Sequence, residues 1–157
     1  MPVKLVLPAA TALAALLGLA GAAHAADCTV QATPLVFGSY RPTLRGPTDV
    51  TATITVTCTA SQAESIGYEI ALLGTGRDAL EAPEGGPALR FGIFVDATRL
   101  RRWGDGMGGT ATLVGSMVLA PGERRSMSYT VYGRLAGGQK VRAGAYAFAP
   151  MITLRLS

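Results

Sequence analysis

DVTATITVTC, residues 49–58, is the stretch that decides the fold of this chain. Small and apolar residues alternate there with threonines, and the apolar set is Val50, Ala52, Ile54, Val56 and Cys58. A period of two built from β-branched residues predicts a strand with one packed face and one hydrated face. A helix would scatter the threonines around its surface, where branched side chains gain little. The rest of the chain must therefore supply an apolar layer for this strand.

Composition and periodicity together favour an all-β domain. Only 15% of the 157 residues are charged, and glycine occurs 20 times, which is more typical of β domains than of helical or disordered chains. An apolar period of two recurs in residues 66–72, 89–95, 113–119, 127–135 and 146–156, and residues 28–40 resemble a strand broken by Pro34. Roughly seven strands separated by turns predict an immunoglobulin-like β-sandwich. Pro34 and Pro150 interrupt two of these segments. Because proline cannot donate to a ladder, we expect an edge strand or a sheet switch at Pro34 and an edge strand at Pro150.

Residues 1–25 resemble a secretory signal peptide. Lys4 provides the positive start, residues 5–19 are apolar, and Ala23 and Ala25 are small residues at the positions that a signal peptidase reads. The alternative is a transmembrane anchor, but the apolar run is short and no basic stop-transfer cluster follows it. We therefore expect a secreted single domain over residues 26–157 with no membrane span in the mature chain.

The two cysteines are interpreted as a disulfide. Cys28 and Cys58 are the only cysteines of the chain, and two cysteines in an exported domain are most simply paired. In the chain-entropy model, closing a loop of about thirty residues stabilises the fold by roughly 3 to 4 kcal/mol. A metal site or a catalytic thiol would need histidines or further cysteines.

The sequence offers no constellation for catalysis. His24, the only histidine, leaves with the predicted leader, so a serine nucleophile would lack its usual base. The carboxylates show no spacing that marks a paired acid and base. We expect no enzyme activity, no cofactor and no metal. The sequence WGDG at 103–106 is alternatively a calcium loop or an anion nest, but a tight turn in which Trp103 covers one end of the sandwich is favoured.

Basic residues are concentrated in two arginine pairs, at positions 101–102 and 124–125. Nucleic-acid binding would require a continuous patch interleaved with aromatic residues, so no nucleic-acid partner is expected. Solvated loop charges are the favoured interpretation. The alternative is a self-sufficient secreted binding module, such as a glycan-binding adhesin, that contacts its surface or ligand through Trp103, Arg101 and Arg102.

Four blocks, taken in order, resemble one known family. CTVQATPLVFGSY (28–40), DVTATITVTC (49–58), RFGIFVDATRLRRWGDG (90–106) and VYGRLAGGQKVRAGAY (131–146) are similar to the spore coat protein U domain, and the resemblance covers nearly all of residues 28–157. That family includes pilins of the archaic chaperone–usher pathway and related surface-coat proteins.

The resemblance implies an incomplete immunoglobulin-like sandwich that lacks its final strand. A periplasmic chaperone lends a strand, and a neighbouring pilin subunit later replaces it by strand addition at an outer-membrane usher. The expected destination is the cell surface, as part of a pilus or coat, after transit through the periplasm. The expected acceptor groove is bordered by two sets of apolar residues: Val30, Leu35 and Phe37 on one side, and Tyr146, Phe148, Ile152, Leu154 and Leu156 on the other.

One departure from the family pattern concerns the segment before the first cysteine. Polymerising subunits carry an alternating donor segment there, whereas only Ala26 and Asp27 separate the expected cleavage site from Cys28. Such a subunit accepts a strand but cannot donate one. The sequence therefore predicts a terminal (tip) subunit, or a role outside polymerisation.

Overall fold

The computed structural model describes residues 26–74, 79–80 and 87–157, so the predicted signal peptide lies outside the described residues. The described part contains strands and no helix, and hence no helix of membrane-spanning length and hydropathy. The strands are β1 (Ala26–Ala32), β2 (Leu35–Tyr40), β3 (Thr48–Ala60), β4 (Glu64–Leu72), β5 (Ala79–Leu80), β6 (Leu89–Phe94), β7 (Leu113–Leu119), β8 (Arg124–Leu135), β9 (Gly144–Phe148) and β10 (Ile152–Leu156).

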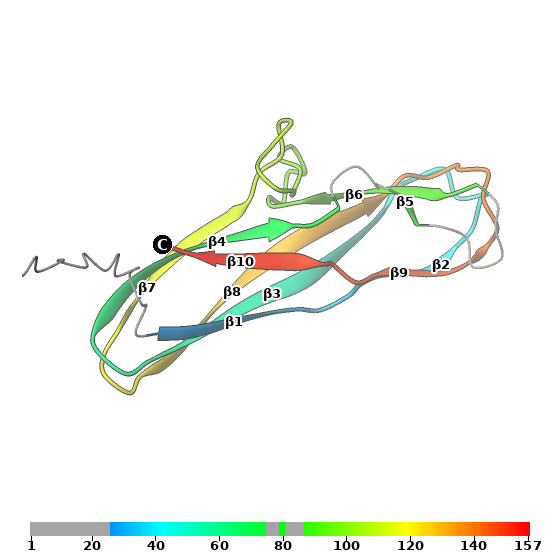
Figure 1. Ribbon diagram of the computed structural model, residues 1–157. Coiled ribbons are helices and arrows are strands. Elements are labelled where there is room, and N and C mark those ends of the chain that lie inside the picture. Colours follow the sequence, from blue (N-terminus) through cyan, green and yellow to red (C-terminus); the bar gives the residue numbers. More distant parts are fainter. Residues whose placement is uncertain (1–25, 75–78, 81–86) are drawn as a thin grey trace, which may run out of the picture.

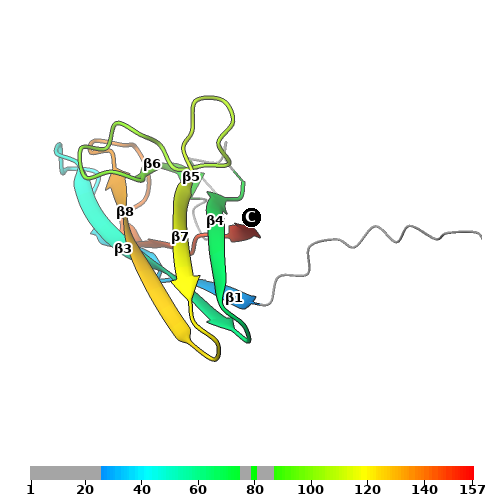
Figure 2. The same ribbon diagram turned by 90° about the vertical axis from the view of Figure 1, so that its left-hand side faces the viewer.

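Two antiparallel sheets form the layers of a β-sandwich (Figure 1). The larger sheet has the order β1-β3-β8-β6-β5, and the smaller one has the order β10-β4-β7. Figure 2 shows β3 and β8 in one layer and β4 and β7 in the other. A separate pair, β2-β9, extends the sandwich at one end. The all-β sandwich predicted from the sequence is confirmed.

Strand β3 is central to the larger sheet, as its sequence pattern predicts. It pairs with β1 on one side and with β8 on the other. Ile54, Val56 and Cys58 are completely buried. The threonines lie on the outer face, where Thr55 and Thr57 share hydrogen bonds of 3.1 and 2.8 Å with serine hydroxyls of β8. One face of the strand therefore builds the core, and the other forms a hydrogen-bonded polar surface.

Cys28 and Cys58 are directly opposed in the β1–β3 ladder and form a disulfide. Their Cα atoms are 4.1 Å apart, the close approach expected of a pair without mutual backbone hydrogen bonds. The bond closes a loop between residues 30 positions apart and fixes β1 to the core strand β3.

Reduction of this disulfide should destabilise the domain. Because the cross-link restricts the unfolded chain, we expect the free energy of unfolding to fall by about 3 to 4 kcal/mol when the bond is reduced. Urea unfolding with and without dithiothreitol measures the difference. The double variant Cys28→Ala/Cys58→Ala is the control, since its stability should not respond to dithiothreitol. An unchanged urea midpoint for the reduced native protein would contradict the expectation.

The chain changes sheets at both prolines, and β10, which follows Pro150, is an edge strand as predicted. The chain leaves the larger sheet after β1, crosses Pro34, and pairs β2 with β9. It leaves β9, crosses Pro150, and pairs β10 with β4 in the smaller sheet. A proline at each junction is compatible with this change of partner because no ladder hydrogen bond is required of it.

A pair of tyrosines joins the two layers across the core. The hydroxyl oxygens of Tyr68 on β4 and Tyr129 on β8 are 2.6 Å apart, and burial together with this hydrogen bond raises the pKa of the Tyr68 phenol. Gly115 on β7 lies beneath both hydroxyls. A Cβ atom at this position would clash with the Tyr129 hydroxyl and lie 2.5 Å from that of Tyr68.

We expect Gly115→Ala to destabilise the fold by about 1 to 3 kcal/mol, because the added methyl group overpacks the tyrosine pair. Gly46→Ala is the matched control, since a Cβ there meets no heavy atom within 4 Å. Thermal or urea unfolding of both variants tests the prediction. Equal stability of the two variants would show that the tyrosine pair adjusts freely.

Candidate functional site

Strands β1 and β10 are sheet edges that lie side by side in different sheets. Among the strands that the structure describes, β1 pairs only with β3, and β10 pairs only with β4. The two edges are neighbours and run in opposite directions (Figure 1). Within the described residues, no backbone hydrogen bond joins them. We call this border between β1 and β10 the seam.

The seam is where the apolar core reaches the surface. The inward residues of β1 and β10 are packed on the core but only half-buried; these are Ala26, Cys28, Val30, Ala32, Ile152, Leu154 and Leu156. The residues opposite Val30 and Cys28 in β3, Val56 and Cys58, have no exposed surface. The inward side chains of β3 are thus completely buried, whereas those of β1, at the seam, are only partly buried.

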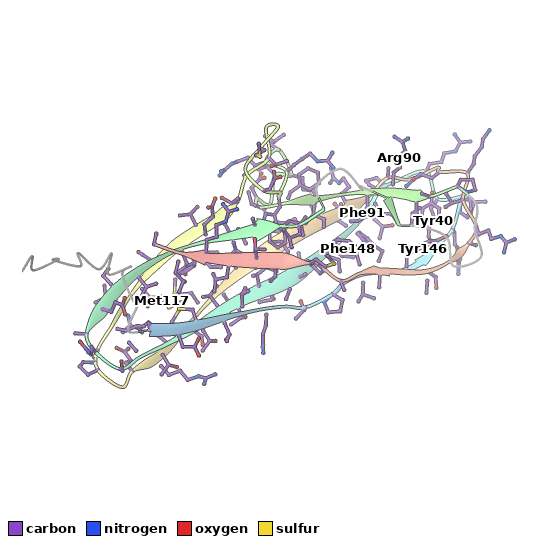
Figure 3. All side chains as sticks on the ribbon, in the orientation of Figure 1. Tyr40, Arg90, Phe91, Met117, Tyr146 and Phe148 are labelled. Atoms are coloured by element: carbon purple, nitrogen blue, oxygen red, sulfur yellow. A yellow bond between two sulfur atoms is a disulfide. The ribbon has the colours of Figure 1, made fainter. Side chains whose placement is uncertain are left out.

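The seam is closed at one end by the β2–β9 ladder. Leu35, Phe37 and Tyr146, which the sequence assigned to the acceptor groove, are buried at this closed end. Phe148 is half-buried, and its ring centroid lies 5.0 Å from that of Phe91. Both side chains are labelled in Figure 3. Of the predicted groove residues, the structure brings Val30, Ile152, Leu154 and Leu156 together at the seam, with Phe148 at the junction.

Three seam residues were not among those predicted. Ala26, Cys28 and Ala32 point to the same side as Val30. Their positions at every second residue of 26–32 could have identified them as seam residues, because alternate residues of a strand face the same way. Their small size, and the structural role given to Cys28, left them out of the prediction.

The two edges are too close for a third strand in their present arrangement. Cα atoms of β1 and β10 approach within 8 Å. Two successive strand spacings require about 9.6 Å. A strand added between β1 and β10 would therefore have to move the two edges apart.

Hydrogen exchange should report the open edges. We expect amides of β1 and β10 that point into the seam to exchange roughly a hundredfold faster than the amides of β3, because they lack a ladder partner. Exchange followed by NMR resolves the strands, and β3 is the internal control. Equal protection throughout β1, β10 and β3 would show that something already satisfies the edges.

Trp103 does not lie at the surface. Only 3% of this residue is exposed, and its Nε1–H donates to the carbonyl of Ile70 at 3.3 Å. Its backbone N–H donates to Ile93, and Gly104 accepts a hydrogen bond from Leu72, so the turn connects both sheets. The ring of Trp103 is therefore part of the core. The neighbouring Arg101 and Arg102 are exposed.

The glycine-rich turn after Trp103 is held by its own side chains. The Oδ1 atom of Asp105 accepts hydrogen bonds from Met107 N–H at 2.9 Å and from the Thr110 hydroxyl at 3.3 Å. Among the residues that the structure describes, no group of three or more His, Cys, Asp or Glu side chains is placed to hold a metal ion. The turn is explained by these internal hydrogen bonds.

The protein is thus a two-layer β-sandwich in which, among the described residues, the neighbouring edges β1 and β10 are not hydrogen-bonded to each other. The chain matches the Spore Coat Protein U domain family over residues 13–149, most of its length, and it belongs to that family. The resemblance carried by the four sequence blocks is confirmed. The family comprises structural domains of pili and surface coats rather than enzymes. A comparison with curated proteins found no match.

Proposed function

We propose that this protein is a non-enzymatic structural subunit of a chaperone–usher pilus or surface coat, assembled by strand addition at the seam. The observation that carries the proposal is the pair of unpaired edges, β1 and β10, flanking half-buried core residues. The partners would be a periplasmic chaperone, an outer-membrane usher and neighbouring subunits, and the route would run through the periplasm to the cell surface.

The chemistry of the seam suits an extended peptide. Backbone groups on the free edges of β1 and β10 would supply ladder hydrogen bonds for any sequence, while apolar side chains entering between Val30 and Leu154 would set the register. Because the two edges run in opposite directions, an inserted strand would be antiparallel to one edge and parallel to the other. Both orientations of a donor strand therefore have one antiparallel partner.

Expression of the secreted protein with and without a chaperone from the same gene cluster tests the proposal. We expect poor recovery of the subunit alone and a one-to-one complex with the chaperone in size-exclusion chromatography. An unfilled border leaves apolar surface and a free edge, which favour aggregation. A stable, monodisperse monomer that does not bind the chaperone would overturn the proposal.

Charge inside the seam should block assembly. Leu154→Asp and Phe148→Asp each place a carboxylate where a donor side chain would pack, so we expect at least a tenfold lower yield of the chaperone complex. Thr153→Asp is the matched control, because position 153 lies on the opposite face of β10. Equal yields of the chaperone complex from all three variants would contradict the assignment of the seam as the binding site.

The terminal position in a fibre remains part of this proposal. Ala26 and Asp27 already pair with Ala60 and Thr59 in the β1–β3 ladder, so these two residues are not free to serve as a donor. If cleavage follows Ala25, no donor segment precedes Cys28. N-terminal sequencing of the exported protein decides the point: a mature start at Ala26 supports a tip or non-polymerising subunit. A start upstream of residue 20 would exclude it, since a donor segment would then exist.

A further inference from the structure

A second feature lies at the end of the sandwich beyond the β2–β9 ladder. Two loops meet there: residues 41–47 join β2 to β3, and residues 136–143 join β8 to β9. Figure 1 shows both loops at the end of the molecule that is far from the C-terminus and from the start of β1. We call these two loops together the loop end.

The loop end concentrates positive charge. Residues 36–48 and 135–150 contain no acidic residue, and their four cationic residues are Arg41, Arg45, Lys140 and Arg142. The whole chain has 14 Lys and Arg against 10 Asp and Glu, so the remaining sequence is balanced in charge. The net charge of +4 is therefore located at one end of the molecule rather than spread over it.

Three of these cations are open to solvent and to a partner. Arg41, Arg45 and Lys140 are exposed. Within the part of the chain that the structure describes, none of the three forms an ion pair or a side-chain hydrogen bond. Their charge is thus not neutralised by the described residues around them.

Several arginines elsewhere on the domain do have acidic partners. Arg125 contacts Glu123 at 2.6 Å. Asp49, which follows the first loop, lies 2.8 Å from Arg134 and 3.4 Å from Arg99. The hydrogen bonds from Arg134 hold the pKa of Asp49 below its usual value, so this carboxylate is ionised and already engaged by two guanidinium groups.

Hydrogen bonds join the two loops into one surface. Gly138 N–H donates to the carbonyl of Leu44 at 2.8 Å, and Gln139 N–H donates to the hydroxyl of Tyr40 at 2.7 Å. The rings of Tyr40 and Tyr146, both labelled in Figure 3, pack edge to face beneath the loops with their centroids 6.4 Å apart. The cations of both loops are therefore presented together.

The first loop also presents an apolar side chain. Leu44 N–H donates to the carbonyl of Arg41 at 2.9 Å, which closes a turn with Pro42 at its second position, where proline is favoured. Leu44 is 49% exposed although its backbone is bonded on both sides. The turn thus holds a leucine in water between Arg41 and Arg45.

We propose that the loop end binds an anionic lipid surface. Guanidinium and ammonium groups bind phosphate through charge-assisted hydrogen bonds, which suits Arg41, Arg45 and Lys140 to lipid headgroups. Cationic residues beside an exposed apolar side chain are typical of binding at a membrane interface, so Leu44 would enter the headgroup region. Leu44 favours a lipid surface over a dissolved polyanion, because a dissolved polyanion offers it no apolar phase.

This activity goes beyond the assembly role proposed above. The seam lies between β1 and β10, whereas the loop end lies beyond the β2–β9 ladder that closes the seam. A strand added at the seam would therefore leave the loop end accessible.

Co-sedimentation with lipid vesicles tests the inference. The protein is the purified subunit, or its chaperone complex with the chaperone alone as a blank. The vesicles contain equal parts of phosphatidylglycerol and phosphatidylcholine, or phosphatidylcholine alone. We expect binding to the anionic vesicles only, weakened about fivefold by each of Arg41→Gln, Arg45→Gln and Lys140→Gln. Arg124→Gln is the matched control, because it removes an exposed cation at the opposite end of the sandwich, where Arg124 pairs with Thr59.

Leu44→Ser separates lipid binding from simple anion binding. Loss of the apolar side chain should weaken binding to the anionic vesicles severalfold while leaving the response to inorganic polyphosphate unchanged. Equal binding of wild type and Leu44→Ser to the vesicles, equal binding to neutral and anionic vesicles, or equal losses in Arg124→Gln and Arg45→Gln would overturn the inference. Arg45→Gln should retain the chaperone complex, so failure at the loop end is distinguishable from failure of the proposed assembly role.

Discussion

Backbone hydrogen bonding at the sheet edges is the constraint on which this structure depends. A strand inside a sheet satisfies its N–H and C=O groups on both sides, as β3 does between β1 and β8. The layers of a sandwich lie about 10 Å apart, roughly twice the spacing of paired strands. Edges in different layers therefore cannot pair unless the chain bends from one layer toward the other. β2 and β9 make this bend and pair, whereas β1 and β10 do not.

Much of this fold was predictable because it depends on local periodicity. Threonine alternation in residues 49–58 identified β3 and its faces, Pro34 marked a possible sheet switch, and Pro150 marked an edge strand. Strand pairing was not predictable in the same way, because parity assigns a residue to a face but not to a partner strand. Parity alone assigned Leu35 and Tyr146 to the groove, and it did not reveal that they lie buried in the β2–β9 pair.

Outward faces were harder to anticipate than the core. Apolar periodicity predicts burial, but Arg90, Arg102 and Arg134 lie well apart in the sequence, and only the β6–β8 register and the bridge at Phe94 bring their strands together. Trp103 shows the opposite case. A large ring among glycines suggested either a cover for the sandwich or an exposed contact, and the hydrogen bond to Ile70 distinguishes the two.

The way in which the seam can open follows from how its edges are anchored. β1 is cross-linked to β3 by the Cys28–Cys58 disulfide, so it cannot peel away from the larger sheet as a separate strand. β10 is held to β4 along its whole length, and the flanking pairs Leu73–Met151 and Gly67–Ser157 extend that ladder at both ends. Each edge is thus fixed to its own layer. Widening the seam must therefore separate the two layers along this border, while the β2–β9 ladder holds them together at one end. The far end of the seam is held as well, because residues 61–63 and 120–123 connect the two layers there and Ala60 is hydrogen-bonded to Gly122 and Glu123. A strand added at the seam, as proposed, would therefore have to widen it between two anchored ends.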